Sequence, residues 1–312
     1  MHNCISILTV VNSAKIIDMK IKLLSLLRSI IDFVIFSNLF IAISVMALSL
    51  ETMFIFGISD SKYPILIFFL TLFVYCFHRI YRLDRRSYKE QLEGRHVWVK
   101  KNRKLFIGIL FSSILGASCC IFLWTNLSTF ITLLPIAAIT LTYSIPCIKT
   151  SKKLLRLRDI KGVKIFAITL VLGLTTVILP LIFYDKLNSI SLQELLFILL
   201  RRFLFIFAIT LPFDIRDVEY DQENDVKTIP IMLGINKSKQ LAILVLIIFI
   251  MLALAQRYFF NNLNFHYMVS LILSAAITIF LITKIKHQKK ELFYPIFIEG
   301  TMLLQFLLVA IF

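Results

Sequence analysis

Residues 240–260 of the chain read QLAILVLIIFIMLALAQRYFF, a run in which Arg257 is the one charged side chain. A helix needs about 20 apolar residues to cross the hydrocarbon core of a bilayer. Because lipid offers the backbone no hydrogen-bond partners, such a run must satisfy its own polar groups and is therefore helical. Similar runs recur along the chain, which is 59% hydrophobic with a mean hydropathy of +0.88. The sequence thus predicts an all-α integral membrane protein.

The apolar runs predict about nine transmembrane helices, separated by short loops. A preceding segment, residues 1–30, alternates four basic side chains with Ile and Leu, which is typical of a helix lying at the membrane interface. We therefore divide the chain into an N-terminal cytoplasmic or interfacial segment, residues 1–30, and one transmembrane domain, residues 31–312. The expected spans are 31–56, 63–82, 104–124, 127–147, 163–184, 191–213, 240–260, 265–285 and 293–312.

Basic residues give the orientation of these spans. All but five of the 34 Lys and Arg residues lie in the N-terminal segment and in alternate loops. By the positive-inside rule, the N-terminus and the long loops are cytoplasmic, as expected for a multi-pass protein of the cell inner membrane. The net charge of +16 follows from this topology and needs no nucleic acid, although part of it suits anionic lipid or a phosphorylated substrate.

One cytoplasmic loop is acidic against this basic background. Directly after the span 191–213 the chain reads DIRDVEYDQENDVKTIP, residues 214–230. If the helix continues, Asp214, Asp217, Asp221 and Asp225 share one stripe of about 80° on its surface. Four carboxylates on one helix face repel one another unless a cation neutralises them. The stripe favours a Mg²⁺ site that also takes substrate phosphate oxygens. The alternative is a solvated helix end with mixed charges.

At this point the sequence resembles the UbiA family of intramembrane aromatic prenyltransferases. The family's second signature is an Asp-rich helix end followed by a Thr-x-Pro string, and a Tyr-Ser pair precedes a basic loop that contacts diphosphate. The Asp-rich second signature is matched by Asp214, Arg216, Asp217, Asp221, Asp225, Thr228 and Pro230. The Tyr-Ser pair is matched by Tyr143 and Ser144, and the basic loop by Lys149, Lys152, Lys153, Arg156 and Arg158.

The resemblance implies a fold, a reaction and a set of roles. It implies nine helices around a central apolar cavity, in which a prenyl diphosphate loses pyrophosphate with help from Mg²⁺ and the allylic cation alkylates a lipophilic acceptor. Mg²⁺ and basic side chains would stabilise the leaving diphosphate. The implied catalytic residues are Asp217 and Asp221, and the implied metal ligands are Asp214, Asp217, Asp221 and Asp225. The residues expected to bind diphosphate are Tyr143, Lys149, Lys152, Lys153, Arg82, Arg86 and Arg216.

The sequence departs from the family's other Asp-rich signature, NDxxDxxxD, which belongs at the end of the second span. Residues 75–86 read YCFHRIYRLDRR and contain no Asn-Asp pair. Three interpretations remain open. Arg79, Arg82 and Arg86 bind the diphosphate in place of one metal ion, a single Mg²⁺ serves altered substrates, or the protein has kept the fold and lost the activity. The arginines are also explained by topology alone.

Other residues and other functions also stay open. His78 is either a packed interfacial histidine or a base. Arg201 and Arg202 lie inside a predicted span, so they mark either a functional site or a tilted or re-entrant segment. A membrane transporter or lipid-binding protein is the main rival to a transferase, but transporters favour polar groups at mid-membrane. The sequence does not indicate the acceptor, the prenyl length or the oligomeric state.

Overall fold

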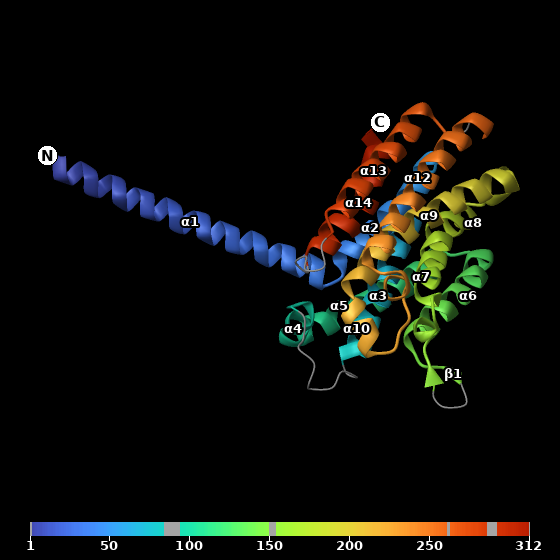
Figure 1. The fold of residues 1–312 in the computed structure, drawn as a ribbon, viewed down its shortest axis with the longest axis horizontal. Coiled ribbons are helices and arrows are strands. Elements are labelled where there is room, and N and C mark those ends of the chain that lie inside the picture. The colour runs from blue at the N-terminus through green and yellow to red at the C-terminus, as the bar shows by residue number, and fades with distance from the viewer. Residues whose placement is uncertain (1, 84–93, 150–153, 261–262, 286–291, 312) are drawn as a thin grey trace.

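The computed structural model describes residues 2–83, 94–149, 154–260, 263–285 and 292–311. They form a bundle of long helices, from which the first helix projects (Figure 1). The principal helices are α1 (His2–Phe36), α2 (Leu39–Ile55), α3 (Lys62–Leu83), α4 (Gly94–Lys101), α5 (Arg103–Trp124), α6 (Leu127–Ser144), α7 (Val163–Gly173), α8 (Leu179–Phe183), α9 (Leu192–Arg216), α10 (Val218–Glu223), α11 (Ile229–Leu233), α12 (Ile235–Phe260), α13 (Phe265–Thr283) and α14 (Gly300–Ile311).

Short elements complete the chain. Two strands form an antiparallel hairpin, β1 (Ile148–Lys149) with β2 (Leu154–Leu155). The remaining elements are single helical turns, η1 (Leu157–Asp159), η2 (Leu174–Ile178), η3 (Leu187–Ser189) and η4 (Tyr294–Glu299). Of these, η2 is a π-helical turn that joins α7 to α8 within one span.

The expected all-α membrane architecture is confirmed. Within the described residues, eight helices are long and apolar enough to cross a bilayer, and the count rises to nine if a bent pair is taken as one span. Their bounds follow the apolar runs, and side chains cap the starts of α6 and α9. At the start of α6, for example, the Asn126 side chain accepts a hydrogen bond from the Thr129 backbone N–H at 2.8 Å.

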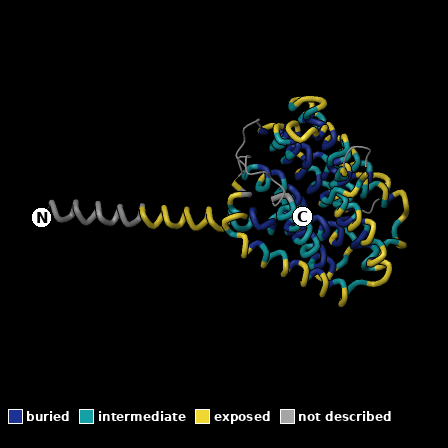
Figure 2. The backbone as a smooth tube through the Cα atoms, turned by 90° about the horizontal axis from the view of Figure 1, so that it is seen from below, coloured by how far each residue is buried: buried dark blue, intermediate teal, exposed yellow. Residues whose placement is uncertain are grey.

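The first predicted span differs from the structure. We expected one helix over 31–56, but α1 continues to Phe36 and the chain turns by 63° before α2 begins at Leu39. The bend is at Asn38, which has a left-handed φ of 67° that interrupts the helix. Before the bend, residues 18–31 of α1 are exposed where the helix projects from the bundle (Figure 2), and residues 32–36 become half-buried or buried as the helix reaches it.

Two faces of the bundle are set by close helix contacts. Helix α9 packs against α7 and α12, and α3 packs against α2 and α5. At Gly173 in α7, an added Cβ would lie 2.8 Å from the Phe203 ring of α9. The missing side chain therefore lets α7 approach α9 closely, and this approach positions the charged residues at the helix ends.

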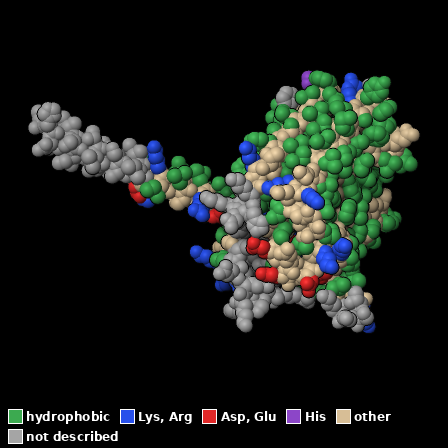
Figure 3. Space-filling view, viewed as in Figure 1, with side chains coloured by type: hydrophobic (Ala, Val, Ile, Leu, Met, Phe, Trp, Pro, Cys, Tyr) green, Lys and Arg blue, Asp and Glu red, His purple; other side chains and the backbone are tan. Residues whose placement is uncertain are grey.

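The short elements gather at one end of the bundle. Figure 1 shows α4, α10 and the β1–β2 hairpin together there, and we call this the loop end. Hydrophobic side chains cover most of the visible bundle surface above it, while acidic side chains of the bundle lie near the loop end (Figure 3). The distribution of the basic loops predicts this arrangement, in which the polar and charged residues gather at one side of the membrane.

Candidate functional site

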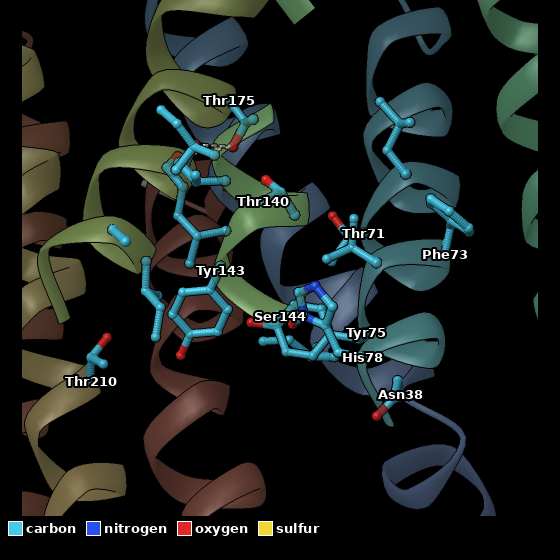
Figure 4. Close-up of a pocket in the computed structure, with 18 of the residues that line it drawn as sticks. Asn38, Thr71, Phe73, Tyr75, His78, Thr140, Tyr143, Ser144, Thr175 and Thr210 are labelled. Carbon is cyan, nitrogen blue, oxygen red and sulfur yellow. Dashed lines mark hydrogen bonds between the residues drawn. The ribbon is translucent and has the colours of Figure 1, made fainter. Parts of the chain in front are cut away.

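A cavity of about 610 Å³ lies inside the bundle, between α3, α6, α7, α9 and the start of α14. Most of its wall is apolar, with Ile67 and Leu70 from α3, Leu133 and Ile136 from α6 and Leu172 from α7 among its lining. Figure 4 shows side chains from several helices converging on it. Charged side chains line the cavity toward the loop end: Arg79, Arg158, Lys164, Asp214, Arg216, Asp217 and Glu299. The cavity thus joins an apolar chamber to a charged mouth.

The centre of the charged mouth is an ammonium held between two carboxylates. Lys164 Nζ lies 2.9 Å from Asp214 Oδ1 and 2.7 Å from Asp221 Oδ2. All three side chains are at least nine-tenths buried. Two negative charges therefore share one positive charge, and the second oxygen of Asp221, Oδ1, has no hydrogen-bond partner among the described residues.

Local backbone geometry brings Lys164 to this position. It is the second residue of α7, and Gly162 just before the helix adopts a left-handed φ of 73°. The Gly162 N–H donates to the Lys227 carbonyl at 3.2 Å, which ties the start of α7 to the segment after α10. This segment begins shortly after Asp221, so the hydrogen bond holds the start of α7 close to Asp221, and the Lys164 side chain contacts it.

Asp217 lies at the cavity beside the Lys164 group but has a different partner. The Arg216 guanidinium donates to it twice, from Nε to Oδ1 at 2.7 Å and from the terminal nitrogen Nη2 to Oδ2 at 3.1 Å. Arg216 also stacks over the rings of Phe213 and Tyr294, at 5.1 and 5.4 Å from their centroids. The predicted diphosphate ligand Arg216 and the predicted metal ligand Asp217 are therefore brought together.

Asp225 is separated from the other three aspartates. The helical stripe ends because α10 stops at Glu223, and Asp225 takes a left-handed φ of 56° in the turn that follows. The Val226 N–H donates to the Asp221 carbonyl at 2.8 Å, which closes this turn. Asp225 is exposed and is not among the described residues that line the cavity. The expectation of one continuous helix face is wrong at this residue.

Tyr143 also lines the cavity and has a cation over its ring. The Arg158 guanidinium is 5.7 Å from the Tyr143 ring centroid, and the His78 ring lies 6.0 Å away on another side. Figure 4 shows Tyr143, Ser144 and His78 in the same part of the cavity. Arg158 is buried, and its Nε has no hydrogen-bond partner among the described residues.

The basic loop predicted to bind diphosphate is described only in part. Lys149 is exposed on β1 and is not among the described lining residues. Lys152, Lys153 and Arg86 lie outside the described residues, and for Arg82 only the helical backbone is described. Sequence reasoning did not single out Lys164, although one lysine at the start of an otherwise apolar span was a signal.

Arg201 and Arg202 form a separate buried group. Arg202 donates to Glu51 of α2 at 2.8 Å and to the Thr52 hydroxyl at 3.2 Å. Arg201 lies against the Phe249 ring, 5.7 Å from its centroid. Neither arginine is among the described lining residues. Since α9 runs without a break through both, the re-entrant alternative for this span is wrong.

Comparison with known proteins identifies the family. The family model described as the UbiA prenyltransferase family matches residues 100–304, well over half of the chain. The chain belongs to the UbiA prenyltransferase family. The Tyr143 and Asp214 regions both lie inside the matched range. Family membership supports prenyltransferase activity in general and an integral membrane location.

Solved structures share the fold at low identity. A UbiA homologue from Archaeoglobus fulgidus bound to GPP and Mg²⁺ is 14% identical, with a TM-score of 0.58 over 89% of this chain and 99% of that chain. An apo UbiA homologue from Aeropyrum pernix K1 is 14% identical, with a TM-score of 0.56 over 87% of this chain and 94% of that chain. A comparison with curated proteins gives no match.

The residues of the charged mouth determine which carboxylates are available to bind a metal ion. Within the described residues, no group of three or more His, Cys, Asp and Glu side chains gathers closely enough to hold a metal ion. Lys164 lies between Asp214 and Asp221, so that pair faces an ammonium. Mg²⁺ often needs only one or two carboxylates when substrate phosphates complete its shell. Among the aspartates that line the cavity, Asp217 is thus the candidate ligand for one Mg²⁺ held together with a diphosphate, and without them it pairs with Arg216.

Proposed function

We propose that the protein transfers a prenyl group from a prenyl diphosphate to a lipophilic acceptor, an aromatic compound being the expected class. The observation that carries this proposal is the cavity itself, an apolar chamber that ends in a cluster of buried cations and carboxylates. Such a chamber suits a molecule with a long hydrocarbon tail and a multiply charged head. The homologue from Archaeoglobus fulgidus was solved with GPP and Mg²⁺, a ligand pair of this kind.

The charged mouth would hold the diphosphate. Lys164, Arg158 and Arg216 come from three different elements and line the same end of the cavity. When the bond between the prenyl C1 and the diphosphate oxygen breaks, the electron pair stays on the diphosphate. Fixed cations next to this developing charge stabilise it without first having to reorganise. Lys149, Lys152 and Lys153 would add to the basic surface at the entrance.

Asp217 would contribute a carboxylate to one Mg²⁺ that the diphosphate also binds. When bound, the ion would act as a Lewis acid that neutralises charge on the leaving group. Asp217 is held in place by the two hydrogen bonds from Arg216, which fixes its orientation at the cavity. Asp221, which the resemblance implied to be a metal ligand, would instead orient Lys164, whose ammonium it contacts at 2.7 Å.

The apolar chamber would hold the prenyl chain and exclude water from the allylic cation. Tyr75, Phe130 and Tyr143 are aromatic side chains in its lining, and ring faces stabilise cations. The acceptor would attack C1 of the chain and then lose a proton. The His78 ring of α3 lies 6.0 Å from the Tyr143 ring and lines the same cavity.

The experiment is incubation of the purified protein in lipid nanodiscs with radiolabelled prenyl diphosphates of several lengths, with and without Mg²⁺. We expect label to bind and to be consumed with release of pyrophosphate, in a Mg²⁺-dependent way. Asp217→Ala and Asp221→Ala should abolish transfer, whereas Glu219→Gln, an exposed acidic position on α10, should not. Full turnover in both alanine variants would overturn the proposal. Label that binds but is never consumed would indicate a member that kept the fold without the activity.

A further inference from the structure

The Lys164 group has the geometry of an occupied cation site. Its ammonium lies within 2.9 Å of carboxylate oxygens from two elements, α9 and α10. Two buried carboxylates this close repel each other strongly, and burying either without a partner costs several kcal/mol. A cation is therefore required at this point, and the chain supplies its own.

The position of this cation is fixed by the fold. Lys164 is carried at the start of α7, whose approach to α9 depends on the contact between Gly173 and Phe203. Its start is also tied to the Lys227 carbonyl through Gly162. A lysine ammonium has three N–H donors, of which two go to Asp214 and Asp221. The third is left for the cavity, which Lys164 lines.

We infer that Lys164 fills the position of a divalent cation between Asp214 and Asp221, so that this pair binds the ammonium instead of Mg²⁺. The third N–H of Lys164 then contacts the diphosphate directly. The part of this inference that concerns the diphosphate rests on the proposed function, whereas the part that concerns the metal does not. Removing the ammonium should uncover a latent metal site that the native chain keeps closed.

Two further observations support a site built for ions. Asp221 Oδ1 is buried without a hydrogen-bond partner among the described residues, so a ligand oxygen is available if the ammonium leaves. The buried Nε of Arg158, which lines the same cavity, also has no such partner in the described chain, so a donor is available for an anion. The charged mouth therefore offers an acceptor for a cation, Asp221 Oδ1, and a donor for an anion, Arg158 Nε.

The first test measures Mn²⁺ binding by electron paramagnetic resonance, in nanodiscs of neutral lipid and with no diphosphate present. The variant is Lys164→Met, which removes the charge and keeps the length of the side chain. We expect it to gain one Mn²⁺ per chain with an affinity at least about tenfold above that of the native protein. Lys161→Met, an exposed lysine of the preceding turn, is the matched control and should gain none.

A second variant tests whether the added ion binds at Asp221. Lys164→Met combined with Asp221→Asn restores the net charge of the group and should lose the added ion. If the native protein already binds Mn²⁺ as tightly as Lys164→Met, or if the double variant keeps the ion, the inference is wrong. Because these measurements contain no diphosphate, they stand even if no prenyl transfer is ever found.

Thermal unfolding covers the case in which Lys164→Met folds poorly. Mg²⁺ at millimolar concentration should raise the Tm of Lys164→Met and leave that of the native protein unchanged. A separate titration with inorganic pyrophosphate at saturating Mg²⁺ tests the third N–H. We expect Lys164→Met to weaken pyrophosphate binding about tenfold relative to Lys161→Met. Equal affinities would rule out the direct contact with the diphosphate.

Discussion

Arg202 of α9 donates a hydrogen bond of 2.8 Å to Glu51 of α2, and both side chains are almost completely buried between the helices. A pair of this kind links two helices that are far apart in the sequence. Its charges are not solvated by water, so each depends on the other. The pair also lies outside the described lining of the cavity, which separates its role from that of the charged mouth.

Glu51→Gln should therefore destabilise the protein strongly without acting on the chemistry directly. Removing one partner of a buried pair leaves an uncompensated charge, which costs about 3–5 kcal/mol. Thermal unfolding in detergent measures the loss. The double variant Glu51→Met with Arg202→Met removes both charges and should recover most of the stability, because apolar replacements of buried pairs are often neutral. A double variant no more stable than Glu51→Gln would contradict this account.

A second stability prediction concerns the close contact between α7 and α9. A Cβ at Gly173 would meet the Phe203 ring at 2.8 Å, whereas one at Gly108 would meet no described atom within 4 Å. Gly173→Ala should lower stability by about 1–3 kcal/mol through overpacking. Gly108→Ala should raise it by about 0.5–1 kcal/mol, because alanine suits a helix interior better than glycine. The Tm values of the two variants in the same detergent check the difference, and equal shifts would contradict it.

The helices were predictable from sequence because hydrophobic runs and membrane thickness constrain them together. The predicted span 191–213 corresponds to α9, Leu192–Arg216, and the predicted span 265–285 corresponds to α13, Phe265–Thr283. The break at Asn38 was not predictable, since a single left-handed residue within an apolar run leaves the hydropathy unchanged.

The candidate site was predictable in its residue types and only partly in its geometry. The acidic segment and the Tyr143 region were both identified, and Asp214, Asp217 and Tyr143 do line one cavity. The role of Lys164 was hidden, because in the sequence it is one more basic residue on the cytoplasmic side. Its partners depend on how α7 packs against α9, and the hydrophobic pattern of the sequence does not show this packing. Asp225 was misplaced because helix periodicity does not show where α10 stops.

A pH-dependent prediction concerns the turn that carries Arg158. Burial acts to raise the pKa of the Asp159 carboxyl, but hydrogen bonds from Arg156 outweigh it and hold that pKa below its usual value. The Asp159 carboxylate therefore stabilises the folded state above its unfolded pKa of about 3.9, and this contribution is lost as the pH falls further. Asp159→Asn should lower the Tm at pH 7 and have a shrinking effect below about pH 4. A constant difference across a Tm-against-pH series would contradict the pairing.

The last prediction separates Asp217 from Asp225, which the sequence pattern treats alike. Asp217 lies at the cavity, whereas Asp225 is exposed in a turn with a φ of 56°. Asp217→Asn should reduce Mg²⁺-dependent consumption of prenyl diphosphate by about 100-fold or more, since even residues that only orient a metal ligand cost about 10- to 100-fold. Asp225→Asn keeps a residue that tolerates the left-handed conformation and should cost much less, whereas Asp225→Val should lower the Tm through backbone strain. Equal losses of turnover in the two asparagine variants would mean that the turn moves to the cavity when substrate binds, and that all four aspartates act together.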